Sequence, residues 1–241
     1  MSPRLIRVLS TAIPASYVPG SMQAHNGGTA NATTMTRTHT FQSTTQDGTV
    51  YVVIGIGADN YNTIITVDDS GLDNSTTIEV EGMIGDAHPA VRLWTYKPSQ
   101  AELTAGSIDL VMNSDGSDVW HTFTCEIIAN AATPVEDAAT NFSTLGRSSA
   151  GSVSVATASS TAVLIALGAT EPSSVTTLTF PTLNGFTFPL AAIDQDVAWD
   201  PAVNMGYREV LASGTYDSPT LDAGAAGEGC SLLCIAFGSP S

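Results

Sequence analysis

The pattern of apolar and polar positions from Thr38 onward is that of β-strands. Apolar residues alternate with polar ones or form short runs such as YVVIGIGAD at 50–59, and Gly, Asp, Asn or Pro ends each segment. No stretch of a dozen residues keeps a helical period. We expect strands near residues 38–45, 50–57, 62–67, 76–83, 90–97, 106–113, 118–129, 151–157, 162–169, 175–180, 185–190, 205–212, 215–222 and 229–237.

The segments between these strands have the composition of tight turns. DDSGLDN at 68–74 and NSDGSD at 113–118 supply residues that tolerate a positive φ between paired strands. Only SQAEL at 99–103 and TPVEDAAT at 133–140 suggest short helical turns. The sequence therefore predicts an all-β fold, an antiparallel two-sheet sandwich with a jelly-roll-like arrangement.

Residues 1–36 differ from the rest of the chain. They are rich in Pro, Gly and Asn, with scattered apolar residues, which predicts an extended N-terminal arm and linker before a body at 37–241. Within the body, the apolar run at 50–59 resembles AVLIALGAT at 162–170. The run WHTFTCEIIA at 120–129 likewise resembles CSLLCIAFG at 230–238. An internal duplication is one interpretation. STLGRSSAGS near 143–152 has the composition of a linker, so the body could be one sandwich or two domains joined there. A single sandwich is the favoured interpretation.

Charge narrows the range of partners. The chain of 241 residues has 23 acidic and 7 basic side chains, a formal net charge of −16. Residues 1–46 contain Arg4, Arg7 and Arg37 and no acidic residue, so a basic arm precedes an acidic body. An acidic body repels phosphate backbones and anionic headgroups, which argues against nucleic acid and membranes as partners. With no long apolar run, we expect a soluble protein made in a cytosol.

The three cysteines are expected to be small core residues. Cys230 and Cys234 are four residues apart, which in a strand places them on one face about 13 Å apart, too far for a disulfide. Cys125 lies in an apolar run. A metal or redox role is the less favoured alternative.

No catalytic or metal-binding arrangement stands out. GRSSAG at 146–151 has the wrong spacing for a nucleophile elbow, and His25, His39, His88 and His121 lack the spacing of a zinc site. His121 and Cys125 share a strand face, but a core histidine is the favoured interpretation. We therefore predict no enzyme activity, no cofactor and no metal.

Acidic residues leave two weaker alternatives. Asp68, Asp69 and Asp73, and separately Asp115 and Asp118, could bind calcium at turns, although solvated hairpin turns are favoured. Glu79 and Glu81 alternate on one strand face, where they could serve as paired glycosidase carboxylates or simply lie exposed.

Three aromatic residues could instead stack on sugars. Trp94 and Tyr96 share one face of the AVRLWTYK strand, and Trp199 lies later in the chain. A core position is favoured for that face, and an exposed glycan platform is the alternative.

One stretch resembles the β-sandwich modules of tailed-bacteriophage structural proteins, most specifically over residues 90–145. In that pattern a Leu-Trp-Tyr-like strand leads through a Pro-containing loop to a Gly-x-Ile-x-Leu strand, a further strand and a Thr-Pro-Val turn. FTCEII at 123–128 departs from the Ser-Phe-x-Gly-Val of related modules. The resemblance implies a structural virion protein with no catalytic residue. The matching positions are Leu93, Trp94, Tyr96, Pro98, Gly106, Ile108, Leu110, Thr133, Pro134 and Val135.

From these features we predict a capsid decoration (cement) protein on the outer surface of an icosahedral phage head. Its expected partners are the major capsid protein and itself, as a homotrimer. The arm would clamp by adding a strand to a partner sheet, unless residues 3–9 form an edge strand of the protein's own sheet. A receptor- or glycan-binding module of a head or tail fibre is the alternative. The predicted partner-binding residues are Arg4, Leu5, Ile6, Arg7, Val8, Tyr17 and Arg37.

Overall fold

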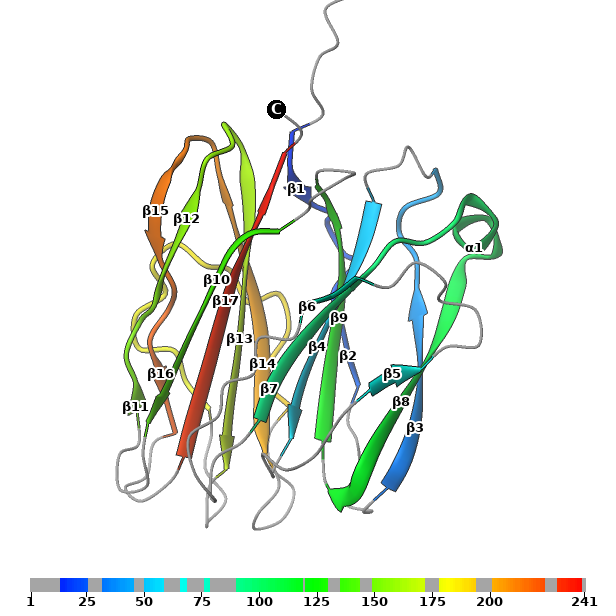
Figure 1. Ribbon diagram of the computed structural model, residues 1–241, viewed down its shortest axis with the longest axis horizontal. Helices are drawn as coiled ribbons and strands as arrows, with labels where there is room; N and C mark the ends of the chain where they lie inside the picture. Colours follow the sequence, from blue (N-terminus) through cyan, green and yellow to red (C-terminus); the bar gives the residue numbers. More distant parts are fainter. Residues whose placement is uncertain are drawn as a thin grey trace, which may run out of the picture.

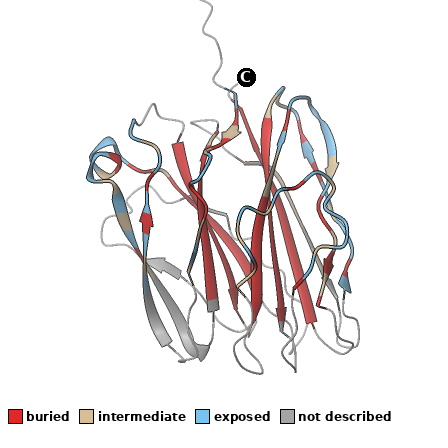
Figure 2. Cartoon of the chain, turned by 180° about the vertical axis from the view of Figure 1, so that it is seen from behind, coloured by how far each residue is buried: buried red, intermediate tan, exposed pale blue. Residues whose placement is uncertain are grey.

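The computed structural model shows β-strands stacked in four layers (Figure 1). Two inner sheets lie face to face, and each is covered on its outer side by further strands. Burial follows the same plan, since the inner strands are buried and exposed residues lie mainly on the outer layers (Figure 2). The structure describes residues 14–25, 32–45, 50–58, 66–68, 76–78, 90–118, 120–129, 135–143, 149–171, 178–193, 201–223 and 229–239.

Every strand pair of the two inner sheets is antiparallel, which confirms the predicted all-β sandwich. The first inner sheet has the order β1-β9-β4-β7-β6, with β2 also on β9, and the second has the order β10-β17-β13-β14. The strands of the first are β1 (Ser16–Tyr17), β2 (Gln23–His25), β4 (Val50–Ala58), β6 (Thr76–Ile78), β7 (Ala90–Tyr96) and β9 (Trp120–Ile128). Those of the second are β10 (Val135–Ser143), β13 (Ala162–Glu171), β14 (Ala202–Val210) and β17 (Gly229–Gly238).

The main core lies between the inner sheets. Alternate residues of β4, β7 and β9, such as Val53, Leu93 and Phe123, pack against those of β13, β14 and β17, such as Ile165 and Leu233. The remaining residues of these strands are buried against the outer layers. Burial on both faces explains why β4 and β17 appear in the sequence as continuous apolar runs rather than as alternating patterns.

Gly57 marks the closest approach of the two inner sheets. A Cβ atom added there would lie 2.4 Å from Val203 Cγ2 and 3.0 Å from Ala169 Cβ. We expect Gly57→Ala to lower the free energy of unfolding by about 1–3 kcal/mol, because the sheets must separate to admit a methyl group. Urea unfolding measures the change. Gly151→Ala is the matched control, because its Cβ would meet only Asn141 Nδ2 at 3.5 Å; an equal loss in both variants would contradict the explanation.

The outer layer of the first half covers the far faces of β4 and β7. Its sheet has the order β3-β8-β5, and its apolar contacts include Ile54, Trp94 and Leu110. A short helix, α1 (Gln100–Ala105), begins at a Ser99/Glu102 capping box and ends at Gly106, whose φ is 85°. The strands are β3 (Ala32–Thr40), β5 (Thr66–Asp68) and β8 (Ser107–Asp118).

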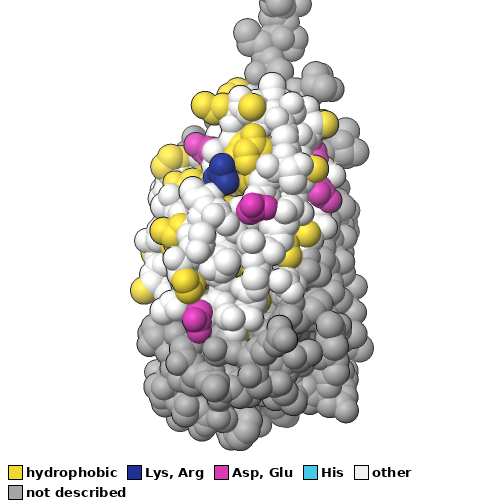
Figure 3. All heavy atoms as spheres, turned by 90° about the vertical axis from the view of Figure 1, so that its left-hand side faces the viewer, with side chains coloured by type: hydrophobic (Ala, Val, Ile, Leu, Met, Phe, Trp, Pro, Cys, Tyr) yellow, Lys and Arg dark blue, Asp and Glu magenta, His cyan; other side chains and the backbone are white. Residues whose placement is uncertain are grey.

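The outer layer of the second half is made of two strand pairs and residues 178–193. β12 pairs with β15 and β11 with β16, and Val155, Phe186 and Leu221 pack beneath them. Viewed from outside, this layer shows few charged side chains among uncharged polar and small apolar groups (Figure 3). The strands are β11 (Ser149–Ala150), β12 (Ser154–Thr157), β15 (Gly214–Asp217) and β16 (Leu221–Asp222).

The two halves repeat one pattern of strand pairing. In the first half β4 lies between β9 and β7 while β3 pairs with β8; in the second β13 lies between β17 and β14 while β12 pairs with β15. Each half also carries an edge strand, β1 and β2 on β9 and β10 on β17. The repeated pairing is what an internal duplication would give, and the return of the chain across two layers in each half is a jelly-roll arrangement. Because the halves share the main core, they form one body.

Three expectations about local structure need correction. TPVEDAAT does not form a helical turn in its described part, because residues 135–140 belong to β10 and pair with β17. The strands expected near 175–180 and 185–190 are, in the described residues, isolated bridges such as Thr187↔Tyr207. β3 spans 32–40, so the expected boundary between residues 36 and 37 falls inside a strand.

The cysteines lie in the core as predicted. Cys125, Cys230 and Cys234 are buried and form no disulfide. Burial raises the pKa of the Cys234 thiol to about 12 and raises that of Cys125 as well, which keeps both protonated. In the described part of the chain, no helix is long and apolar enough to span a membrane.

Candidate functional site: the anchored base of the N-terminal arm

Residues 14–25 follow the edge of the first inner sheet. Ser16 and Tyr17 of β1 pair with Ile128 and Ile127 of β9, and Gln23 to His25 of β2 pair with residues lower on the same strand. The N-terminal arm is therefore attached to the body well before residue 37. We call residues 14–25 the arm base.

The arm base also contacts the second half. The amide N–H of Ala15 donates to Thr161 Oγ1 at 3.0 Å, and that of Tyr17 donates to Glu209 Oε1 at 2.8 Å. The Tyr17 ring stacks on Tyr207 with 3.8 Å between ring centroids. Ala15 and Tyr17 thus connect the arm base to the second half, while β1 pairs with the first inner sheet.

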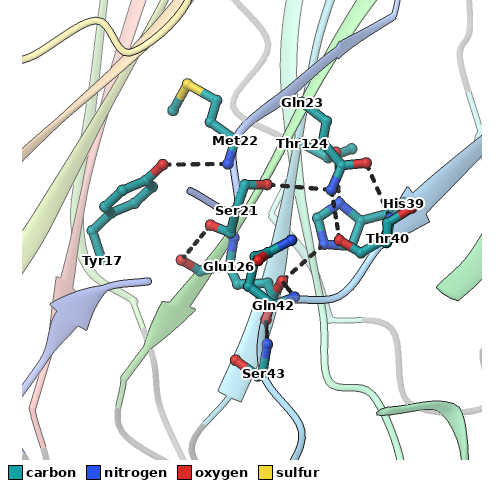
Figure 4. Close-up of polar contacts among 10 residues, drawn as sticks. All are labelled: Tyr17, Ser21, Met22, Gln23, His39, Thr40, Gln42, Ser43, Thr124 and Glu126. Atoms are coloured by element: carbon teal, nitrogen blue, oxygen red, sulfur yellow. Dashed lines mark hydrogen bonds and ion pairs between the residues drawn. The ribbon is translucent and has the colours of Figure 1, made fainter. Parts of the chain in front are cut away.

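A buried carboxylate fixes the chain beyond β3. Glu126 is fully buried and points from β9 toward the segment that follows β3 (Figure 4). Its two oxygens accept the amide N–H groups of Gln42 at 2.6 Å and Ser43 at 2.9 Å, and His39 Nε2 lies 3.4 Å from Oε1. The other ring nitrogen, His39 Nδ1, is 2.8 Å from Thr124 Oγ1.

These hydrogen bonds hold Glu126 ionised. Burial on its own raises the pKa of the carboxyl group, but the bonds from His39, Gln42 and Ser43 outweigh burial and lower the pKa below its usual value. Bonds to a charged acceptor are the strong ones. The charge is therefore a structural clamp rather than a reactive base.

Further polar contacts tie the arm base to β9 and β3. Ser21 Oγ accepts the Glu126 N–H at 2.9 Å, and Tyr17 Oη accepts the Met22 N–H at 3.2 Å (Figure 4). The Gln23 side-chain amide pairs with the backbone of Thr40 in both directions, at 2.6 and 3.0 Å. Gln23 therefore acts like one more peptide unit between the first inner sheet and its outer layer.

Comparisons with known proteins give only weak similarity. No family model matches the chain, and no curated protein matches it. Among solved structures, the atomic structure of Sulfolobus Turreted Icosahedral Virus is 9% identical, covers 94% of this chain and 90% of its own, and has a TM-score of 0.26. The crystal structure of the STIV MCP is 9% identical, the match covers 94% of this chain and 97% of that chain, and the TM-score is 0.26. The major capsid protein P2 of bacteriophage PM2 is 10% identical, the match covers 91% of this chain and 98% of that chain, and the TM-score is 0.23.

The chain is weakly similar in structure to viral major capsid proteins. The TM-scores are low, and the jelly-roll arrangement described above rests on the strand pairing of this chain. The narrower resemblance to tailed-phage modules stays a prediction, since no family model supports it.

The predicted partner-binding residues separate into three groups. Arg4, Leu5, Ile6, Arg7 and Val8 lie outside the described residues. Tyr17 lies in the main core with 6% of its surface exposed, where it serves internal packing rather than a partner surface. Arg37 is half-buried on β3 and donates to the Thr36 carbonyl at 3.0 Å.

The aromatic residues considered for glycans lie mainly in the core. Trp94 is 4% exposed and Tyr96 is 2% exposed, both beneath the outer layer of the first half. The Tyr96 hydroxyl donates to Glu102 Oε1 at 2.5 Å. Neither ring presents a face to solvent. Trp199 lies outside the described residues.

The remaining candidates do not form a metal site where they are described. Among the described residues, no group of three or more His, Cys, Asp or Glu side chains could hold a metal ion. His39 contacts Glu126, while His121 is buried on the opposite face of β9, the face that carries Phe123 and Cys125. His88, Asp69, Asp73, Glu79 and Glu81 lie outside the described residues, as do the side chains of Asp68, Asp115 and Asp118.

Sequence reasoning missed Glu126 as a site residue. The available signal was a glutamate in the apolar run FTCEIIA, on the same face as Thr122 and Thr124. A charged residue in a buried strand needs compensating partners, and these come from residues more than 80 positions away.

Proposed function

We propose that this protein is a structural component of a virion, made in the host cytoplasm, and more specifically a decoration protein on the outer surface of an icosahedral head. The observation that supports this proposal most is the arm base. A chain segment anchored to both inner sheets suits a protein that holds neighbouring subunits together mechanically.

The body supports the same proposal. Its inner sheets are buried on both faces, and each half has the jelly-roll arrangement that is common in viral capsid domains and also in lectins and cupins. Such a body resists deformation because its strands exchange hydrogen bonds along their full length.

The arm is proposed to bind the major capsid protein, with the decoration protein itself a homotrimer. Residues 4–8 intersperse two Arg among Leu, Ile and Val, so they can extend a partner sheet by backbone hydrogen bonds while the guanidinium groups meet carboxylates. Arg37 would add a further contact near the arm base.

Copy number in purified particles tests the proposal. Quantitative mass spectrometry against the major capsid protein is expected to give hundreds of copies in fixed ratio to the capsid subunits. A few to a few dozen copies would indicate a fibre component instead. Absence from particles would overturn any virion role.

Charge reversal in the arm is expected to weaken attachment. Arg4→Glu/Arg7→Glu should lower the affinity for particles stripped of this protein by about tenfold, because attraction to carboxylates becomes repulsion. Co-sedimentation measures bound and free protein. Arg4→Lys/Arg7→Lys keeps the charge and should retain most of the binding; equal binding by the reversed and conservative variants would rule out a charged arm contact.

A further inference from the structure

Gln23 and Thr124 lie side by side on two paired strands. They are directly opposite one another in the antiparallel register of β2 and β9. Opposite residues project from the same face of a sheet, with Cβ atoms about 4.5–5.5 Å apart, so a glutamine carboxamide can reach a threonine hydroxyl across the pair. Both side chains extend toward the end of β3, where Gln23 bonds Thr40 and Thr124 contacts His39 (Figure 4).

The Thr124 hydroxyl has the surroundings of an activated nucleophile. His39 Nδ1 lies 2.8 Å from Thr124 Oγ1, and His39 Nε2 lies 3.4 Å from Glu126 Oε1. Because the carboxylate is ionised, it favours the tautomer with the proton on Nε2, which leaves Nδ1 to accept the hydroxyl proton. A hydroxyl, a histidine base and a carboxylate that orients the base are the parts of an acyl-transfer triad.

The Gln23 carboxamide is held in the manner of an acyl donor. The Thr40 N–H donates to Gln23 Oε1 at 3.0 Å, where it can stabilise the negative charge that forms on this oxygen during nucleophilic attack. The amide nitrogen donates to the Thr40 carbonyl at 2.6 Å and to the Ser21 carbonyl at 3.5 Å. Thr40 is exposed, so ammonia released beside it can leave to solvent.

Burial protects this group of residues from water. Thr124, His39 and Glu126 are each fully buried, and Gln23 is half-buried. The Thr124 hydroxyl therefore meets little competition from water for the Gln23 carbonyl carbon. A single reaction within the chain suits such a closed site, because both reacting groups are already in place and no substrate has to enter.

We propose that Thr124 and Gln23 become joined by an intramolecular ester that forms once in the folded chain. The Thr124 oxygen bonds to Gln23 Cδ while its proton passes to His39 Nδ1. The Cδ–Nε2 bond then breaks, and the leaving nitrogen takes that proton and departs as ammonia. The ester fastens the arm base covalently to β9. This inference goes beyond the proposed function and does not depend on it.

Peptide mass spectrometry of the purified full chain tests the ester. Trypsin is expected to separate residues 8–37, which contain Gln23, from residues 93–147, which contain Thr124. The ester joins these two peptides at a mass about 17 Da below their sum, because ammonia is lost. The joined peptide is expected from most molecules of the unmodified protein, and its absence would overturn the proposal.

Substitutions assign the reacting groups. Thr124→Val keeps the shape of the side chain without the hydroxyl, and should give no joined peptide. Thr122→Val is the matched control and should keep it, because Thr122 is equally buried on the same face of β9 but lies opposite His25. His39→Gln removes the base and should slow joining by about 100-fold or more in a time course after cell-free synthesis.

Two further outcomes would overturn the proposal. One is a joined peptide that persists in Thr124→Val, since the bond would then involve another side chain. The other is a loss of ammonia confined to residues 8–37, since the Asn26-Gly27 pair can lose ammonia by closing to a succinimide. The measurement uses the isolated protein, so its result is independent of the copy number in particles.

Discussion

Glu126→Ala is expected to lower the free energy of unfolding by about 3–5 kcal/mol, the usual cost of removing one partner from a buried charged network. The substitution leaves the amide N–H groups of Gln42 and Ser43 and the His39 ring without their acceptor. Urea unfolding followed by fluorescence measures the loss. Glu126→Gln keeps one acceptor oxygen and the shape, and should lose less.

An exposed carboxylate provides the control. Asp109 accepts the Thr38 hydroxyl at 2.6 Å on the surface, and Asp109→Asn should change stability by no more than about 0.5 kcal/mol. If Glu126→Ala were as mild as Asp109→Asn, the buried carboxylate would not be what fixes the segment that follows β3.

The same network predicts a direction for the pH dependence. The folded-state pKa of Glu126 lies below its unfolded value, so its contribution is fully present above the unfolded pKa and is lost as pH falls through the folded pKa. The stability difference between the unmodified protein and Glu126→Gln should therefore be largest near neutral pH and shrink in acid. A difference that grew in acid would contradict the assigned charge state.

Tyr17→Ala is the second substitution with a large expected effect. It removes a buried ring that stacks on Tyr207 and contributes to the main core, which should cost about 3–5 kcal/mol. It should also accelerate amide exchange in residues 14–25 more than in β4 or β13, because β1 is the part that depends on this ring.

Tyr17→Phe separates the ring from its hydroxyl. It loses the contacts of the hydroxyl with the Met22 N–H and the Ser21 side chain, and should cost about 1 kcal/mol. Equal losses for the Ala and Phe variants would show that the hydroxyl, and not stacking across the two halves, anchors the arm base.

The sequence predicted the inner strands well. The runs that indicated strands at 50–57, 90–97, 162–169 and 229–237 correspond to β4, β7, β13 and β17. The runs at 50–57, 162–169 and 229–237 are apolar on both faces of a strand, and that at 90–97 alternates; turn residues end each of them. SQAEL at 99–103 likewise indicated the short helical turn that is α1, whose capping box is a local interaction.

Other elements depend on partners far along the chain. The residues of β10, VEDAATNFS, include helix-forming side chains and no apolar run, and they are a strand because β17 provides a ladder of hydrogen bonds. Gln23 and Thr40 form a pair only because β2 and the end of β3 meet at one corner. The local sequence pattern does not predict such a contact between distant segments.

The sequence by itself determined that this chain is all-β and that its cysteines are buried, since these follow from local hydrophobic pattern and turn chemistry. Only the tertiary structure decided that Trp94 and Tyr96 face inward, that Tyr17 joins the two inner sheets, and that Glu126 holds the segment that follows β3. The physical reason is that hydrophobicity is a property of each residue, whereas layer order, register and the partners of a buried charge are fixed by contacts between residues distant in sequence.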